Sequence, residues 1–280
     1  MAAEELGPTL QKIKEVGVFT IGHRETSVPL SYLDGEQKPV GFSVELCQIV
    51  AEKIKNRLGL PALQISYVPV TSSTRIPLVA NGTVDIECGS TANMIPRQQQ
   101  VAFSVTTFAP QFRWIALKES GLKSAEDLKG KQVILTAGSN TNAFVLKLNA
   151  EKALGMTILH GKDHAESFLY VETGRAAAFM EDDILLAGLK AGSKNPDRFM
   201  FLQDEYVSDP YALMFRKDDM AFKQLVDEAL TEAMKSGLYA KLYKKWFESS
   251  VPPKGINLAF PMSEKLKALV ASPNDKAIGQ

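Results

Sequence analysis

The chain has 280 residues, 45% of them hydrophobic and 23% charged, which is typical of a folded protein with two lobes or one large domain. Its 32 basic residues balance its 32 acidic residues, and this balance argues against nucleic acid or a polybasic membrane surface as a partner. No apolar run reaches the ~18–20 residues that a membrane-spanning helix requires.

The amino terminus, MAAEELGPTLQKIKE, is acidic and has no apolar core, so no signal peptide is predicted. The chain is therefore expected to be cytoplasmic, or exported and present here in its mature form. Two cysteines and three histidines lack the spacing of a metal site, and neither a metal nor another cofactor is expected. Cys47 falls in a predicted helix and Cys88 ends a predicted strand. They either pair in an oxidising compartment or remain buried thiols.

Short apolar segments alternate with helical patterns along the chain. In the first half, strands are predicted at 16–22, 63–70, 84–88 and 112–118, with a helix over about 43–58 and a short helix that carries Arg75. In the second half, strands are predicted at 132–136, 156–160, 176–180, 199–202 and 211–216, with helices from about 140, 164, 183 and 218 and a last helix at 263–271. This alternation predicts an α/β fold with largely parallel sheets.

An internal repeat organises these elements. VGVFTIGHR matches KQVILTAGSN, LQISYVPVTSS matches MTILHGKDH, and residues 75–90 match residues 167–182, in the same order. The repeat predicts two similar lobes, each a mostly parallel sheet flanked by helices, joined by a two-strand hinge. Residues 1–117 plus 212–280 are assigned to the first lobe and residues 118–211 to the second.

The segment NGTVDIECGSTANMIPRQQQ, at 81–100, predicts a strand that breaks at Gly89 and leads through hydroxyl residues into a helix. Backbone N–H groups, hydroxyls and the positive end of a helix dipole would then face one point, which suits an anion. Arg97 would be its bidentate partner. The alternative is an ordinary strand-to-helix corner with a surface arginine.

Ligands of open parallel sheets bind beyond the carboxyl ends of the strands, so a cleft between the lobes should collect polar residues from both. The candidates are Arg24, Ser72, Arg75, Ser90 and Arg97 from the first lobe, and Ser139, Asn140, Thr141, His164 and Asp182 from the second. Three buried guanidinium groups require anions and one carboxylate requires a cation. An acidic amino acid supplies both.

This charge pattern predicts which group of the ligand each residue binds. Ser90 and Arg97 are assigned to the α-carboxylate and Asp182 to the ammonium group, while the side-chain carboxylate is assigned to Arg24, Ser72, Arg75 and His164. Each of these residues also has a simpler alternative. Arg24 would lie in a solvated loop, Arg75 would form an ion pair on a helix surface, and Arg97 would belong to an exposed polar face. His164 and residues 139–141 would only cap helices. Asp183 is the alternative to Asp182.

At these residues the chain resembles the family 3 solute-binding proteins of bacterial ABC importers, which have the type II periplasmic binding fold, and within them the glutamate/aspartate-binding branch. The matching motifs are GHRE at 22–25, TS at 71–72, RIPL at 75–78, NGT at 81–83, ECGST at 87–91, KDH at 162–164, GRA at 174–176, AFM at 178–180, DD at 182–183, LLAG at 185–188 and RKDD at 216–219. The resemblance implies a periplasmic protein, expected to be a monomer, whose lobes close over one amino acid and deliver it to a membrane permease.

Two positions depart from the family pattern. Ala92, which follows Ser90 and Thr91, and Asn140 each replace a hydroxyl residue that contacts the ligand in the family. Losing a hydrogen bond to a charged group costs ~1.5–3 kcal/mol. An acidic amino acid, L-glutamate or L-aspartate or both, is the expected ligand, and a related dicarboxylate or a polar amino acid is the alternative.

An enzyme on the same fold is a competing hypothesis, because a dehydratase of cyclohexadienyl acids resembles this family. Such chemistry needs a general acid or base. Glu87 and Glu181 are the candidates, but neither has an evident partner in the sequence, and the chain is expected not to be an enzyme. A sensor ectodomain is a third hypothesis, against which the lack of a spanning segment argues.

Overall fold

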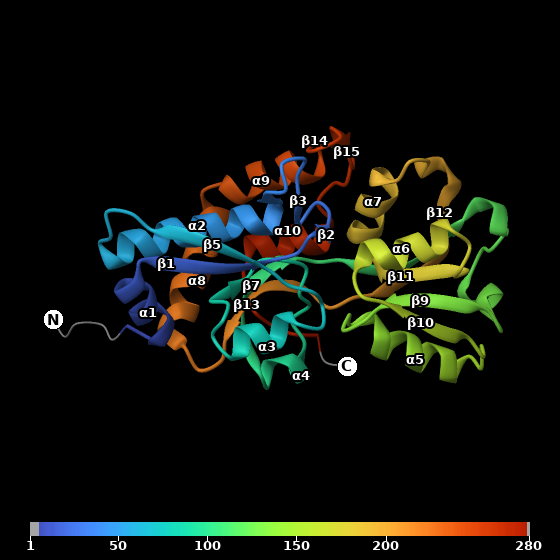
Figure 1. The fold of residues 1–280 in the computed structure, drawn as a ribbon, viewed down its shortest axis with the longest axis horizontal. Coiled ribbons are helices and arrows are strands. Elements are labelled where there is room, and N and C mark those ends of the chain that lie inside the picture. Colours follow the sequence, from blue (N-terminus) through green and yellow to red (C-terminus); the bar gives the residue numbers. More distant parts are fainter. Residues whose placement is uncertain (1–5, 279–280) are drawn as a thin grey trace.

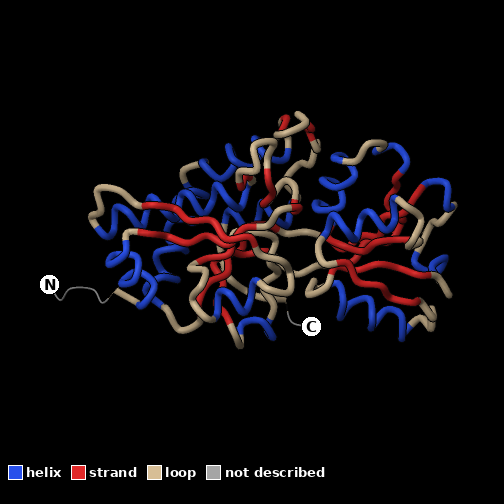
Figure 2. Tube along the Cα trace, viewed as in Figure 1, coloured by secondary structure: helices blue, strands red, loops and turns tan. Residues whose placement is uncertain are grey.

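The computed structural model describes residues 6–278, which form two five-stranded sheets side by side, each with helices on both faces (Figures 1 and 2). The helices are α1 (Pro8–Val16), α2 (Phe42–Leu58), α3 (Arg75–Ala80), α4 (Ile95–Gln98), α5 (Thr141–Glu151), α6 (His164–Glu172), α7 (Asp183–Gly192), α8 (Met220–Lys235), α9 (Leu238–Phe247) and α10 (Glu264–Ala271). Over residues 6–278, no helix combines the length and the apolar character needed to span a bilayer.

The two sheets have the same strand arrangement. The first runs β5 (Gln64–Pro69), β1 (Val18–His23), β6 (Ile86–Glu87), β13 (Tyr211–Arg216), β7 (Val101–Phe108), and the second runs β10 (Thr157–Gly161), β9 (Gln132–Thr136), β11 (Ala178–Asp182), β8 (Gln111–Leu117), β12 (Phe199–Val207). In each sheet the first three strands pair in parallel and the fourth is antiparallel to both neighbours. One strand therefore opposes the direction of the other four.

The repeat predicted from the sequence is confirmed by this order. The matched segments form β1 and β9, β5 and β10, and β6 and β11, and each pair has the same place in its sheet. Two small sheets add to the frame: β2 (Thr26–Ser27), β3 (Ser31–Leu33) and β4 (Pro39–Val40) form one, and β14 (Ser250–Val251) and β15 (Ile256–Asn257) form the other. The fold is α/β with two similar halves, as predicted.

The predicted lobe boundary at residue 117 needs correction. Residues 111–117 form β8, which pairs with β11 and β12 of the second sheet, because its apolar side chains Phe112, Trp114 and Ile115 belong to the core of that half. The chain passes between the sheets at 109–110, just before β8, and at 208–210, just before β13. We propose these two passages as the hinge.

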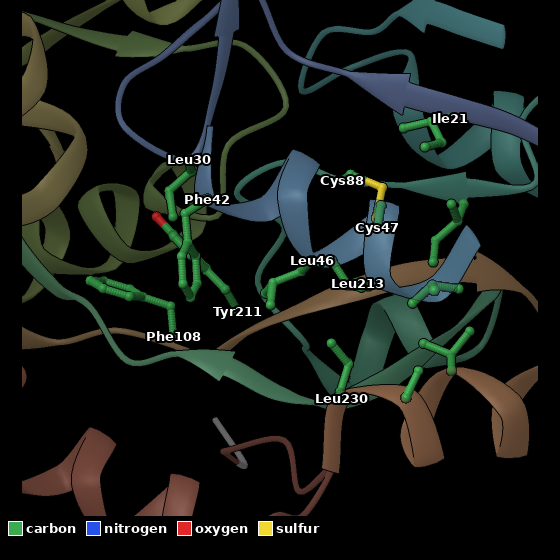
Figure 3. Packing of buried hydrophobic residues seen from close by; sticks show 14 of the residues in the cluster. Ile21, Leu30, Phe42, Leu46, Cys47, Cys88, Phe108, Tyr211, Leu213 and Leu230 are labelled. Atoms are coloured by element: carbon green, nitrogen blue, oxygen red, sulfur yellow. A yellow bond between two sulfur atoms is a disulfide. The ribbon is translucent and has the colours of Figure 1, made fainter. Parts of the chain in front are cut away.

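The first half is held together by an apolar layer beneath α2 and α8. Ile21 of β1, Leu46 of α2, Leu213 of β13 and Leu230 of α8 belong to one buried cluster (Figure 3). On the other face of the sheet, Val79 of α3 belongs to a smaller cluster with strand residues. A disulfide joins Cys47 of α2 to Cys88 after β6, with the two Cα atoms 6.3 Å apart, so the structure supports the paired alternative.

In the second half, alternate side chains of a strand face opposite sides of the sheet. Val133 and Leu135 of β9 belong to the buried cluster with Val145 of α5, whereas Ile134 belongs to the cluster with Phe168 of α6 on the opposite face. Figure 1 shows α5 on one side of this sheet and α6 and α7 on the other. Helices thus cover both faces of each sheet. The edge at the carboxyl ends of the strands is left for polar side chains.

Candidate functional site

The polar candidates follow the ends of equivalent strands in the two sheets. Arg24 follows β1, Ser72 lies between β5 and α3, and Ser90 follows β6. In the second sheet, Ser139 follows β9 and His164 begins α6 after β10. Because four of the five strands in each sheet share a direction, these residues gather at one edge of each sheet, as predicted.

The two edges are in direct contact. Ser73 Oγ donates to Ala137 O (3.1 Å) and Arg97 Nη2 donates to Gly138 O (3.3 Å), so both hydrogen bonds join the first half to the second. Gly138 has φ +78°, and a Cβ there would lie 2.8 Å from the backbone of Ser72. Only glycine allows the two backbones to approach this closely.

Two arginine side chains are buried at this junction. Arg24 is 1% exposed and Arg75 is 2% exposed, and Arg24 Nη1, Arg75 Nε and Arg75 Nη1 have no hydrogen-bond partner within residues 6–278. Burial, and then the charge of Arg75, lower the pKa of Arg24 to about 10, while Glu87 and Glu181 act in the opposite direction. A buried and unpaired charge costs several kcal/mol, so this pair requires an anion.

Arg97 lies in the short helix that follows the hydroxyl segment, as predicted, and this helix, α4, has four residues and begins at Ile95. The guanidinium of Arg97 reaches back along its own segment, where Nη1 donates to Ala92 O at 3.0 Å. Burial and the charge of Arg75 lower the pKa of Arg97 to about 10, against the opposing effect of Asp209.

The segment after β6, residues 90–92, is buried, and part of it already forms hydrogen bonds within the protein. Thr91 Oγ1 donates to Glu87 Oε2 at 2.5 Å, and the Thr91 carbonyl accepts from Ala212 N. Ala92 pairs with Tyr211 through a backbone bridge. Ser90 is 6% exposed. The prediction that Ser90, Thr91 and Ala92 contact a ligand remains a prediction.

Residues 139–141 form a compact hydroxyl turn at the start of α5. Ser139 Oγ donates to Glu181 Oε2 (2.9 Å) and accepts from Thr141 Oγ1 (3.1 Å). Asn140 occupies the N-cap position without a capping hydrogen bond from its side chain. Burial raises the pKa of Asp209, and the Asn140 side chain counteracts that shift. The side-chain nitrogen of Asn140, Nδ2, is buried with no partner within residues 6–278.

His164 is not the helix cap, since Asp163 Oδ1 accepts from Glu166 N and caps α6. The ring is 2% exposed. Its Nδ1 lies 3.1 Å from Thr136 Oγ1 and 3.5 Å from Glu181 Oε2, while Nε2 is buried with no partner within the described residues. Burial, and then the charges of Arg24 and Arg75, hold the pKa of His164 well below its usual value.

Asp182 and Asp183 have separate environments. Asp182 accepts from Ser208 Oγ at 2.6 Å, in the passage at 208–210, and from the hydroxyl of Tyr211 just after it, whereas Asp183 accepts from Gln111 N at 3.2 Å. Burial, and then the neighbouring Glu181, raise the pKa of Asp182 well above its usual value. A cation beside Asp182 would offset that cost.

Sequence reasoning underestimated several residues of this site. Glu87 and Glu181 entered only as possible catalytic acids, although both are buried beside the arginines. Ser208 and Tyr211 were not predicted to contact Asp182. Their only sequence signal was their position near the second passage between the lobes. No group of three or more His, Cys, Asp or Glu side chains within residues 6–278 is arranged to hold a metal ion.

The chain is similar to known proteins over nearly all of its length. The sequence profile of the bacterial extracellular solute-binding proteins, family 3, matches residues 19–249. The L-glutamate/L-aspartate-binding protein of Pseudomonas aeruginosa is 50% identical over 100% of this chain and 93% of its own length. The glutamate/aspartate import solute-binding protein of Salmonella typhimurium is 45% identical over 99% of this chain and 91% of its own length.

Solved structures show the same fold. An ancestral arginine-binding protein bound to arginine has a TM-score of 0.73 and 28% identity, with 82% of this chain and 98% of that chain covered. A histidine-bound substrate-binding protein of an ABC uptake transporter from Streptococcus pneumoniae has a TM-score of 0.75, with 89% of this chain and 99% of that chain covered. At 21% identity the second likeness concerns the fold alone.

Proposed function

The chain belongs to the bacterial extracellular solute-binding proteins of family 3, and from this membership we propose that it binds an acidic amino acid, L-glutamate or L-aspartate or both, between its two lobes. Members of this family bind solutes, so the chain is a binding protein and not an enzyme. The buried pair Arg24 and Arg75, with donors that no described residue satisfies, is the observation that carries the choice of an acidic ligand.

The residues divide by the charge of the group they would hold. Arg24, Ser72, Arg75 and His164 would meet the side-chain carboxylate, since each has a buried polar atom without a partner within the described chain. A carboxylate accepts up to four hydrogen bonds and would cancel the repulsion between the two guanidinium groups. This part of the site would distinguish an acidic amino acid from a neutral one.

The remaining groups would hold the amino acid backbone. Arg97 and Ser90 would bind the α-carboxylate and Asp182 the ammonium group, with Thr91, Ala92, Ser139, Asn140 and Thr141 lining the same junction. The hydroxyls of Ser208 and Tyr211 would orient the Asp182 carboxylate toward the cation. Contacts from both lobes mean that either lobe alone offers half a site, so binding would favour the closed arrangement.

The location and partner follow from the family. We infer that the protein works in the periplasm and delivers its ligand to the membrane permease of an ABC importer, and that it acts as a monomer. The disulfide between Cys47 and Cys88 is in keeping with an oxidising compartment.

Isothermal titration with L-glutamate and with L-aspartate tests the proposal. We expect one-to-one binding of at least one of them, and much weaker binding of L-glutamine and L-asparagine, whose amides cannot neutralise the arginine pair. If neither acidic amino acid released or absorbed heat or protected the protein against thermal unfolding, the proposal would fail.

A further inference from the structure

Glu181 places a second carboxyl group beside Asp182 at the proposed binding site. It is the last residue but one of β11, beside Asp182, is 1% exposed, and belongs to the second lobe. Its Oε2 accepts from Ser139 Oγ (2.9 Å) and lies 3.5 Å from His164 Nδ1, and its Oε1 accepts from the N–H of Asp182 (3.2 Å). The carboxylate is therefore held on the Nδ1 side of the imidazole ring.

A chain of hydrogen bonds indicates which ring nitrogen carries the proton. Ser167 Oγ donates to Asp163 O (2.9 Å), so the Ser167 oxygen is free to accept from Thr136 Oγ1 at 3.0 Å. The Thr136 oxygen then accepts from His164 Nδ1 at 3.1 Å. This direction satisfies every contact in the chain and places the proton of neutral His164 on Nδ1, which also faces the Glu181 carboxylate.

The opposite nitrogen of His164 is then an acceptor. Nε2 is buried with no partner within residues 6–278, and it belongs to the group of atoms proposed to meet the side-chain carboxylate of the ligand. A carboxylate and an unprotonated imidazole nitrogen are both acceptors and cannot bond to each other. One additional proton on Nε2 turns this contact into a charge-assisted hydrogen bond.

We propose that binding of an acidic amino acid is accompanied by the uptake of one proton by the His164–Glu181 pair, an inference that rests on the function proposed above. A proton from solvent adds to Nε2 and forms the imidazolium. Its charge then lies between the ligand carboxylate on one side and the Glu181 carboxylate on the other. Glu181 thus makes acidic ligands bind together with a proton, and neutral ligands without one.

The charges around the pair favour this change only when the ligand is present. Burial, and then the charges of Arg24 and Arg75 from the first lobe, disfavour a charged His164 in the unliganded protein. A bound carboxylate cancels that repulsion. Burial raises the pKa of Glu181, against the hydrogen bond from Ser139 and the charges of Arg24 and Arg75.

The other charged groups near the pair have partners of their own. Asp182 accepts from two hydroxyls, one of them that of Tyr211 on β13. Arg113, opposite Glu181 on β8, donates to Glu205 at 2.6 Å.

Two more acids lie near Arg24 and a further cation lies near Glu181. Glu87 accepts from Thr91 through Oε2, while its Oε1 is buried with no partner within residues 6–278, and Asp163 caps α6. Arg97 is bound to the carbonyls of Ala92 and Gly138. The uptake of a proton is assigned to His164 and Glu181 because Nε2 of His164 is the acceptor proposed to meet the ligand carboxylate, and replacement of Glu87 tests the other buried acid.

Calorimetry of the whole protein measures the proton directly. L-Glutamate, L-aspartate and L-glutamine would be titrated in pairs of buffers with different ionisation enthalpies at several pH values between 5.5 and 8. Uptake of close to one proton is expected for the acidic ligands in the pH range where the affinity changes, and none for glutamine. In that range the affinity for L-glutamate should rise about tenfold for each unit by which the pH is lowered.

Replacing Glu181 or Glu87 with glutamine shows which of these two buried acids is needed for proton uptake. In Glu181→Gln the side-chain amide donates to Nδ1 of His164, so neutral His164 carries its proton on Nε2 and the pH dependence should disappear. The matched control Glu87→Gln should keep it.

The outcomes are distinct. Binding of an acidic amino acid without proton uptake in the unmutated protein would overturn this inference and leave the proposed function standing. Uptake that persists in a folded Glu181→Gln variant, or that is lost in Glu87→Gln instead, would also overturn it. Failure of every acidic amino acid to bind at any pH would refute the proposed function, and this inference with it.

Discussion

Replacing Arg75 with methionine removes one of the two buried cations while keeping a side chain of similar length. Arg75 Nε and Nη1 are two buried donors without partners in the described chain. A hydrogen bond to a charged group contributes ~1.5–3 kcal/mol, so two of them at the lower value amount to about 3 kcal/mol. The affinity for L-glutamate should therefore fall by about two orders of magnitude.

The same change should cost a neutral ligand much less. The glutamine side chain has one acceptor oxygen, and its NH2 group cannot accept from Arg75. L-Glutamine would therefore lose one hydrogen bond from the guanidinium, about 1.5 kcal/mol, so the preference for glutamate over glutamine should shrink by about tenfold. The unliganded variant should be at least as stable as the parent protein, because Arg24 no longer faces a second buried guanidinium.

Titration calorimetry with both ligands, together with the thermal midpoint of the unliganded protein, provides the test. Arg175, an exposed arginine whose guanidinium lies 4.2 Å from the centre of the Tyr170 ring, supplies the matched control Arg175→Met, which should leave both affinities unchanged. An equal loss of affinity for glutamate and glutamine in Arg75→Met would refute the assignment of this residue to the side-chain carboxylate.

Three further changes test other parts of the account. Gly138→Val should weaken binding by at least tenfold in calorimetry and prevent ligand-induced compaction in small-angle scattering, because its Cβ would meet the Ser72 backbone at 2.8 Å; normal compaction would contradict this. The double replacement Cys47→Ser and Cys88→Ser opens a link across 41 residues and should lower the free energy of unfolding in urea by about 4 kcal/mol on a chain-entropy estimate; an unchanged midpoint would contradict it. Burial raises the pKa of Asp183 to about 6, so the folded protein binds more protons than the unfolded chain between about pH 4 and 6. Its thermal stability should fall as the pH rises through that range, and Asp183→Asn should reduce this dependence; an identical pH profile in the variant would contradict the assignment.

Much of the fold could be predicted because the sequence repeats itself. The matched segments before Arg24 and before Ser139 form strands at the same place in each sheet. The strand β7 was missed because Ser104, Thr106 and Thr107 are buried in it, and their polar character hides the strand pattern. Helix α1, at 8–16, was also missed, since its nine residues carry only a short apolar stripe.

The site was predictable as a set of residue types but not as a set of contacts. Arginines, hydroxyls and one aspartate at strand ends indicate that the ligand carries an anionic and a cationic group. This inference depends on residue types alone and requires no interatomic distances. The contact of Asp182 with Ser208 depends on how the hinge passage lies against β11, which no local pattern encodes. The contact of Glu181 with His164 joins the end of one strand to the start of a helix that follows another.

A crystal structure of the protein with L-aspartate or L-glutamate would show directly whether the buried arginines hold the side-chain carboxylate of an acidic amino acid. We expect that carboxylate to lie within hydrogen-bond distance of Arg24 and Arg75, with the α-carboxylate at Arg97 and the ammonium at Asp182. An α-carboxylate bound to Arg24 and Arg75, or a ligand bound away from the junction of the two lobes, would contradict this expectation.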